Sequence, residues 1–114
     1  MTKGILYVET WPTTPDREAE FHRWYDEVHL REVVQLIPGI TSARRYDRVR
    51  DDGGFVALYE FDVDDPMDVI RALRTAMAEE HFQMSPAVRM DPPPVMRLLT
   101  ARSVYNAEYG LRFT

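Results

Sequence analysis

EFHRWYDEVHLREVVQLIPGITSARRY, residues 20 to 46, is the stretch that decides the fold of this chain. Its apolar side chains recur at spacings of three and four residues: Phe21, Trp24, Tyr25 and Val28. This spacing predicts an amphipathic helix, beginning near residue 16, that lays one face on a sheet. The helix must end at Pro38-Gly39, because proline cannot continue its hydrogen-bond ladder. Residues 40–50 then alternate as a strand does.

The rest of the chain supplies three more strands and a second helix. Residues 4–11 are branched or aromatic on both faces, which predicts a strand covered on both sides. The Asp-Asp-Gly-Gly turn at 51–54 predicts that residues 55–61 pair antiparallel with the preceding strand. A second helix opens at Asp64-Asp65-Pro66 and is predicted to end near Met84.

Prolines and the C-terminal residues define the last part of the chain. Residues 85–94 contain four prolines, which predicts an irregular loop. Residues 95–105 are predicted to form the last long strand. The tail that follows keeps Tyr109, Leu111 and Phe113, which are too apolar for a free end and indicate a docking surface.

The order of elements is therefore strand, helix, strand, strand, helix, strand. It predicts an α+β chain of one domain, residues 1–114, with a ferredoxin-like βαββαβ fold. Two helices would cover one face of a four-stranded antiparallel sheet. The strands are apolar on both faces, so we expect a second subunit to cover the other face in a homodimer.

Composition narrows the classes of function. The formal net charge of -5 argues against nucleic acid, whose non-specific binding relies on clustered Lys and Arg. The chain has no cysteine, which removes disulfides, thiolate metal sites and cysteine nucleophiles. We also see no signal-like lead-in and no apolar run of membrane-spanning length, so we expect a cytoplasmic protein. With no phosphate-binding glycine loop either, we expect no cofactor.

The same stretch resembles a known family. The run Phe21 to Leu30 (FHRWYDEVHL), then Ile37-Pro38-Gly39-Ile40 and Ala43 to Tyr46 (ARRY), is similar to the pattern of EthD-like proteins of the dimeric α+β-barrel superfamily. The resemblance implies a homodimer whose sheets pack as a barrel, with a pocket between each sheet and its own helices. It also implies activities such as polyketide cyclase, lactone isomerase and anthrone-type monooxygenase. Many relatives have proline where this chain has Arg31, two residues after the histidine.

His29 is the first candidate for chemistry. Imidazole titrates near neutrality, so it could move a proton from a phenol, enol or lactone carbon. Asp26, three residues earlier, could orient it, or could instead pair with Arg23 or Arg31 on the surface. His29 could also merely order the loop before the next strand, and we expect it to contribute little to packing.

A metal site is not expected on this helix. His22, Asp26 and His29 are the ligand types of a facial triad. Two residues seven apart on a straight helix, however, are separated by about 10 Å, too far to share one ion. His81 could ligate haem only by loose analogy, and a helix-terminal histidine is the better interpretation.

Aromatic and charged residues on the strands complete the candidate site. Tyr7, Tyr46, Tyr59 and Trp24, with Tyr25 beside it, could line an aromatic cavity in which a phenol donates to a developing enolate, or could simply fill the core. Glu9 is an acid in an apolar strand and would be a plausible base if it faced that cavity. Arg44 or Arg45 could anchor an anionic oxygen, but on a strand only one of the two can point inward. The alternative for either arginine is a salt bridge at the subunit interface.

Two classes of function remain open from the sequence. The first is a small cofactor-independent enzyme that acts by proton transfer on an aromatic or polyketide-like intermediate, as a cyclase, isomerase or oxygenase. The second is a non-catalytic ligand-binding or accessory barrel, which the absence of a nucleophile or phosphate loop favours. A cavity of about 300 Å³ or more, with His29 and a tyrosine on its wall, would favour the first.

Overall fold

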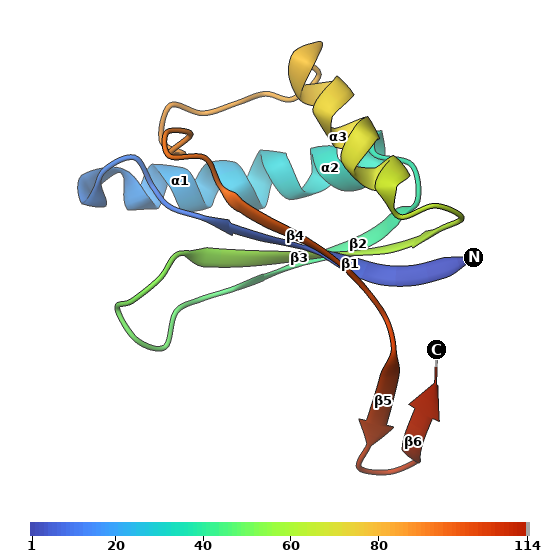
Figure 1. Ribbon diagram of the computed structural model, residues 1–114. Helices are drawn as coiled ribbons and strands as arrows, with labels where there is room; N and C mark the ends of the chain where they lie inside the picture. Colours follow the sequence, from blue (N-terminus) through green and yellow to red (C-terminus); the bar gives the residue numbers. More distant parts are fainter. Residues whose placement is uncertain (114) are drawn as a thin grey trace.

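The computed structural model describes residues 1–113 and contains a four-stranded antiparallel sheet. The strands lie in the order β2-β3-β1-β4, with the bounds β1 Thr2–Thr10, β2 Ile40–Tyr46, β3 Phe55–Val63 and β4 Val95–Thr100. Both helical regions lie on one side of this sheet (Figure 1). The predicted α+β architecture is confirmed at this level, and it is compatible with a ferredoxin-like fold.

The first helical region is continuous from a short 3-10 turn at Pro15–Arg17 to Leu36. It comprises α1 (Glu18–Trp24), a π-helical turn (Tyr25–His29) and α2 (Leu30–Leu36). The helix and its end before Pro38-Gly39, both expected from the sequence, are confirmed. Gly39 has a φ of 90°, a conformation that glycine adopts without a steric penalty, and this lets the chain turn into β2.

The second helix, α3 (Met67–Ala78), is shorter than the sequence predicted. Its start is confirmed, because the Asp65 carboxylate accepts a hydrogen bond of 3.0 Å from the Met67 amide. Its predicted end near Met84 is wrong: Glu80 has a φ of 58°, which terminates the helical path. Residues 79–94 then form an irregular segment, of which the loop 85–94 was predicted.

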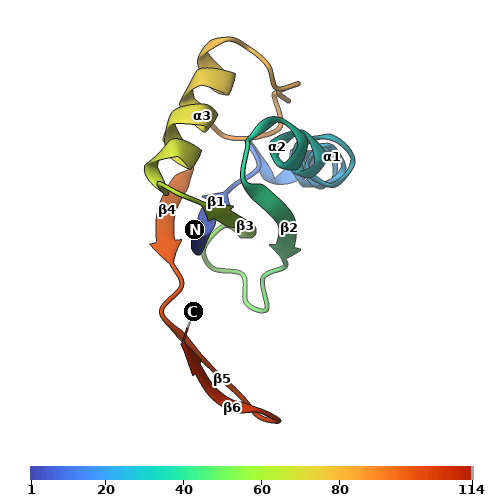
Figure 2. The same ribbon diagram turned by 90° about the vertical axis from the view of Figure 1, so that its right-hand side faces the viewer.

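The last predicted strand is also wrong in its extent. Strand β4 ends at Thr100, and residues 103–113 form a separate hairpin of β5 (Ser103–Asn106) and β6 (Gly110–Phe113). The Asn106 side chain accepts hydrogen bonds from the amides of Glu108 and Tyr109, at 2.7 and 3.1 Å, and shapes the turn. Figures 1 and 2 show that this hairpin projects away from the helices.

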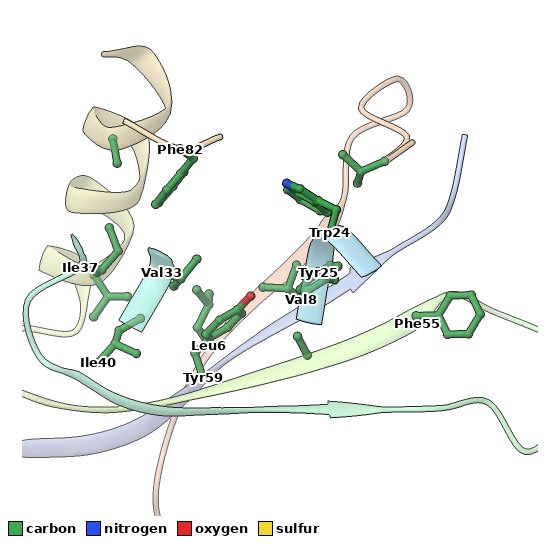
Figure 3. Close-up of a cluster of buried hydrophobic side chains, with 14 of the residues drawn as sticks. Leu6, Val8, Trp24, Tyr25, Val33, Ile37, Ile40, Phe55, Tyr59 and Phe82 are labelled. Carbon is green, nitrogen blue, oxygen red and sulfur yellow. The ribbon is translucent and has the colours of Figure 1, made fainter. Parts of the chain in front are cut away.

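The hydrophobic core lies between the helices and one face of the sheet. Leu6 and Val8 of β1 and Tyr59 of β3 point toward Tyr25 and Val33 of the helix (Figure 3), and all five are buried. The alternation of β1 therefore turns Leu6, Val8 and Thr10 toward the helices. Ile5, Tyr7 and Glu9 must then point to the opposite side.

The outer face, defined as the sheet face away from the helices, is covered by no other part of the described chain. Register places Ile5 beside Leu99 and Tyr7 beside Leu58 on this face. Leu99 is 46% exposed, and the other three are partly exposed. The outer face thus carries an apolar patch among polar residues, and this patch is open to solvent in this single chain.

Within residues 1–113, no helix combines the length and the apolar character needed to cross a lipid bilayer.

Gly4 provides a test of the sheet packing. A Cβ atom at this position would collide with the Leu99 carbonyl oxygen and the Phe61 ring. We expect Gly4→Ala to lower the free energy of unfolding by about 2 kcal/mol, because neither backbone nor buried ring can move away cheaply. Urea unfolding measures this, with Lys3→Ala as the exposed neighbouring control. Equal stabilities of the two variants would contradict the packing described.

Candidate functional site

A cavity of about 230 Å³ lies between the helices and the sheet. Its floor is formed by Leu6, Val8, Thr10 and Tyr59, and its helical wall by Trp24, Tyr25, His29 and Val33. The opposite side is closed by α3 and by the segment after it, from which the Phe82 ring points inward (Figure 3). The cavity is predominantly apolar, as small-molecule sites are.

The π-helical turn places His29 in the wall of this cavity. The Leu30 amide donates to the carbonyl oxygen of Tyr25, five residues earlier, instead of four as in an α-helix. The extra residue brings the His29 ring onto the Trp24 indole, with ring centroids 4.5 Å apart and planes inclined by 21°. Turns of this kind are frequent at functional sites.

Aromatic rings surround the imidazole on its other sides. Tyr25 meets it edge-on at 5.1 Å and Phe82 at 5.5 Å. The expectation that His29 contributes little to packing is therefore wrong, because the ring belongs to a buried aromatic cluster. Burial lowers the pKa of His29 from 6.5 to about 4, since the charged imidazolium would lose its hydration there. The imidazole is neutral at pH 7.

Three hydroxyl groups accompany His29 in the cavity wall. Burial raises the pKa of Tyr25, and burial together with the neighbouring Tyr25 raises that of Tyr59, so both phenols stay protonated. Thr10 contributes the third hydroxyl.

These polar atoms lack partners within the cavity. Thr10 Oγ1, Tyr25 Oη, His29 Nδ1 and Tyr59 Oη are all buried, and none makes a well-formed hydrogen bond to residues 1–113. The Tyr25 hydroxyl lies close enough to the hydroxyls of Thr10 and Tyr59 to influence its pKa, whereas His29 Nδ1 has no polar neighbour of this kind. A buried polar group without a partner costs about 1–3 kcal/mol. Four such atoms around one space depart from the rule that buried polar groups are hydrogen-bonded, and they make the space suited to a polar molecule.

Methionines line the rim of the cavity. Met77 of α3, Met84 and Met90 of the following segment, and Met96 of β4 all border it. Each is between 37% and 45% exposed. Methionine is flexible and polarisable, so this rim can adapt its shape to an apolar ligand.

The segment after α3, residues 79–94, covers the cavity, and we call it the cover. It is hydrogen-bonded to the first helical region. The Trp24 indole donates a hydrogen bond of 2.6 Å to the Gln83 carbonyl oxygen. The Gln83 amide in turn donates 2.9 Å to the Glu32 carboxylate. Trp24 therefore both stacks on His29 and holds the cover in place.

The proline-rich loop is bonded to the loop between β1 and α1. Thr13 donates from its hydroxyl to the Pro86 carbonyl oxygen at 2.6 Å and from its amide to Ala87 at 2.7 Å. The Arg89 amide donates 2.9 Å to the Trp11 carbonyl oxygen. These bonds join the cover to the end of the strand that forms the floor.

Asp26 does not contact His29 in this structure. Its carboxylate pairs with Arg45, at 2.9 Å, on the surface of the helix. The Arg45 guanidinium also lies 2.8 Å from His22 Nδ1 and 4.5 Å from the centre of the Tyr25 ring. Of the two arginines considered, Arg45 is the one that faces the helices, and it stabilises the back of the aromatic cluster.

Four predicted site residues lie on the outer face, away from the cavity. Tyr7 and Glu9 point there from β1, and Arg44 and Tyr46 point there from β2. The Glu9 carboxylate accepts a hydrogen bond of 2.8 Å from the Gly54 amide. Of the residues predicted for the site, the structure therefore brings together Trp24, Tyr25, His29 and Tyr59 around the cavity. The four residues on the outer face lie apart from this group.

Sequence reasoning missed Thr10, Phe82 and the methionine rim. Thr10 is the polar residue on the inward face of β1, which its alternation with Leu6 and Val8 could have indicated. The segment that carries Phe82, Met84 and Met90 has no regular periodicity, so its contacts could not be predicted.

Within residues 1–113, no three His, Asp or Glu side chains converge in a way that could hold a metal ion. His22 and His29 in particular belong to different clusters.

Comparison of the chain with models of protein families, with curated proteins and with solved structures finds no match.

The depressed pKa of His29 predicts a pH-dependent stability. The unfolded chain binds a proton at His29 below about pH 6.5, whereas the folded chain binds it only near pH 4. Stability must therefore fall as the pH drops through this window, by about 3 kcal/mol from this group alone. We expect His29→Phe to remove that part of the decrease, measured by urea unfolding at pH 7 and pH 4. His81→Phe, at an exposed position, should leave the decrease unchanged, and identical pH profiles for wild type and His29→Phe would contradict the burial of His29.

Proposed function

We propose that the chain is a small cofactor-independent enzyme that binds an aromatic or polyketide-like intermediate in this cavity and transfers a proton through His29. The observation that carries the proposal is the set of four unpartnered polar atoms around one apolar space. Such atoms are costly in an empty or fully apolar core and useful against a ligand.

The types of these atoms favour a ligand with both a carbonyl and an acidic hydrogen. The Tyr25 and Tyr59 phenols are neutral donors, suited to a carbonyl oxygen that becomes an enolate. With its proton on Nε2, the neutral His29 ring offers Nδ1 as an acceptor. The proton would pass from the ligand to His29 while the negative charge moves onto the oxygen held by the phenols.

The pKa of about 4 limits the substrates that His29 can deprotonate. A catalytic base is most effective when its pKa lies near the operating pH, so this low pKa makes His29 a weak base and a simple phenol a poor substrate. An enolisable β-dicarbonyl or a hydroxyquinone is a stronger acid than a phenol and is therefore easier to deprotonate. An anion bound beside His29 would also raise its pKa by favouring the imidazolium.

The volume of the cavity favours a small ligand. Sites for drug-sized molecules span about 300–1,000 Å³, and this cavity, at about 230 Å³, falls below the value that we set from the sequence. One or two fused rings fit such a space. The flexible methionine rim could admit a longer substituent.

A non-catalytic binding protein is the second candidate. The specific observation in its favour is the same low pKa, because a weakly basic imidazole can accept a hydrogen bond from a ligand without removing a proton. In that case the cavity would hold the ligand and leave it unchanged.

The dimeric barrel belongs to this proposal as well. The outer face carries an apolar patch that a second copy would cover, in agreement with the resemblance to EthD-like proteins. The cavity lies on the other side of the sheet, so each subunit would carry a complete set of the four polar atoms.

Benzoylacetone, an aromatic β-dicarbonyl of suitable size, tests the proposal. We expect the protein to accelerate exchange of its methylene hydrogens in D₂O, followed by NMR. His29→Phe keeps the ring stack on Trp24 but removes the acceptor, so it should slow the exchange by about a hundredfold. Its unfolding temperature at pH 7 should stay within a few degrees of wild type.

His22→Ala is the matched control, since His22 lies on the same helix outside the cavity, and it should leave the exchange rate unchanged. Saturable quenching of tryptophan fluorescence by benzoylacetone, without faster exchange, would instead support the binding protein. Neither binding nor exchange would reject both candidates for this ligand class.

A further inference from the structure

The C-terminal hairpin, residues 103–113, has one apolar face that nothing in the described chain covers. Its register places Tyr105 opposite Leu111, with Phe113 on the same face. These side chains are 74%, 55% and 80% exposed. A two-stranded hairpin alone is marginally stable in water, so this one needs a surface to pack on.

A groove of about 640 Å³ lies open on the outer side of the sheet, where the chain leaves β4. Ile5 and Leu99 form its apolar part, and Thr41 borders it from β2. Glu60 and Asp62 line it as well. One carboxylate oxygen of Asp62, Oδ1, is buried and has no hydrogen-bond partner among residues 1–113.

The hairpin cannot fill the groove of its own chain in this conformation. Ala101 is part of the groove wall, and its amide is fixed by a hydrogen bond of 2.8 Å to the Lys3 carbonyl oxygen. Tyr105 follows four residues later on extended chain, about 13 Å farther along. Figures 1 and 2 show the hairpin directed away from the sheet, on the side opposite the helices.

We propose that the hairpin is an exchanged arm, which packs its Tyr105, Leu111 and Phe113 face into the groove of a second copy of this chain. The hairpin and the groove lie on the same side of the sheet. A two-fold axis would therefore place each arm on the partner's groove, as an isologous interface requires.

The areas involved suit a stable dimer. An aromatic side chain buries about 150–250 Å², so Tyr105 and Phe113 of the arm together offer about 400 Å². Two arms and the two surfaces that they cover would then bury about 1,600 Å², the size of a standard protein interface.

The charges of the arm and of the rest of the chain also favour a second copy of the chain as the occupant of the groove. The first 101 residues hold 18 of the 19 acidic residues and 12 of the 14 basic ones, whereas the arm with Arg102 adds two arginines and one glutamate. The arm with Arg102 is therefore basic and residues 1–101 are acidic, which favours contact between the arm and the partner's sheet. Arg102, at the base of the arm, is the donor that would reach the unpartnered carboxylate of the partner's Asp62.

Light scattering after size exclusion, from 1 to 100 μM protein, tests this arrangement. We expect wild type to have twice the chain mass of 13.4 kDa. Tyr105→Ser/Phe113→Ser should raise the dissociation constant of the dimer at least a hundredfold. Val104→Ser alters the opposite face of the same strand and should change it less than threefold. Because the hairpin projects away from the core, the double variant should stay folded as a monomer, and it should unfold at a lower temperature than wild type only because it loses the stabilisation that the dimer adds by mass action.

A disulfide between copies tests which surfaces meet. The chain has no cysteine, so Phe113→Cys and Thr41→Cys proteins can be mixed under mild oxidation with diamide. We expect a mixed disulfide dimer, and none when Val104→Cys replaces Phe113→Cys.

Several outcomes would overturn the proposal. One is a wild-type monomer at 100 μM, and another is a dimer that the double variant leaves intact. The third is an absent mixed disulfide. If the double variant does not fold, Arg102→Glu takes its place and must weaken the dimer at least tenfold for the proposal to stand. Exchange of benzoylacetone hydrogens is measured separately, so a failure of the arm does not decide the role of the cavity.

Discussion

The stack of the His29 imidazole on the Trp24 indole is the contact on which the cavity depends. It shields most of the imidazole from water, and this lowers the pKa of His29 and favours the neutral ring. It also orients the indole so that its N–H reaches Gln83 and holds the covering segment. The π-helical turn makes the stack possible, because a regular helix would direct residues 24 and 29 to different sides. One additional residue in a turn therefore determines the electrostatics of the site and its closure.

The sequence was sufficient for the layers of this fold and insufficient for the orientation of its site. The spacing of Phe21, Trp24 and Tyr25 predicted the buried face of the helix, because residues three and four apart lie on the same face of a helix with 3.6 residues per turn. Regular helix geometry also predicted that Asp26 and His29 would lie close together. In the structure both belong to the π-helical turn, where Asp26 pairs with Arg45 and His29 lines the cavity. On β1, both faces are apolar, so alternation alone could not decide whether Tyr7 or Leu6 faces the helices. Glu9 and Tyr7 were placed in the candidate site for that reason.

The two sides of the sheet have different chemical characters. The side toward the helices carries neutral hydrogen-bond donors and acceptors in an apolar setting. Electrostatic interactions are strong there, so a small change in the charge of a ligand would change its binding energy considerably. The outer side carries exposed charged residues such as Arg44 and Glu60 among apolar ones. Salt screens the charges there, so the binding of a partner to this side depends mainly on the fit of the two surfaces. Because β1 contributes to both sides, a substitution on it must be interpreted by its position in the alternation. Neighbouring residues such as Tyr7 and Val8 belong to different surfaces.

The attachment of the cover has a consequence for how a ligand would enter and leave. Trp24 holds the cover through Gln83, and Thr13 holds it through Pro86 and Ala87, so the backbone above the cavity has little freedom to open. The rim beside it consists of methionine side chains, which change rotamer within picoseconds to nanoseconds. Passage past such a rim requires no loop displacement. We therefore expect ligand residence times to be set by the strength of binding inside the cavity, without the slower step that a hinged lid would impose.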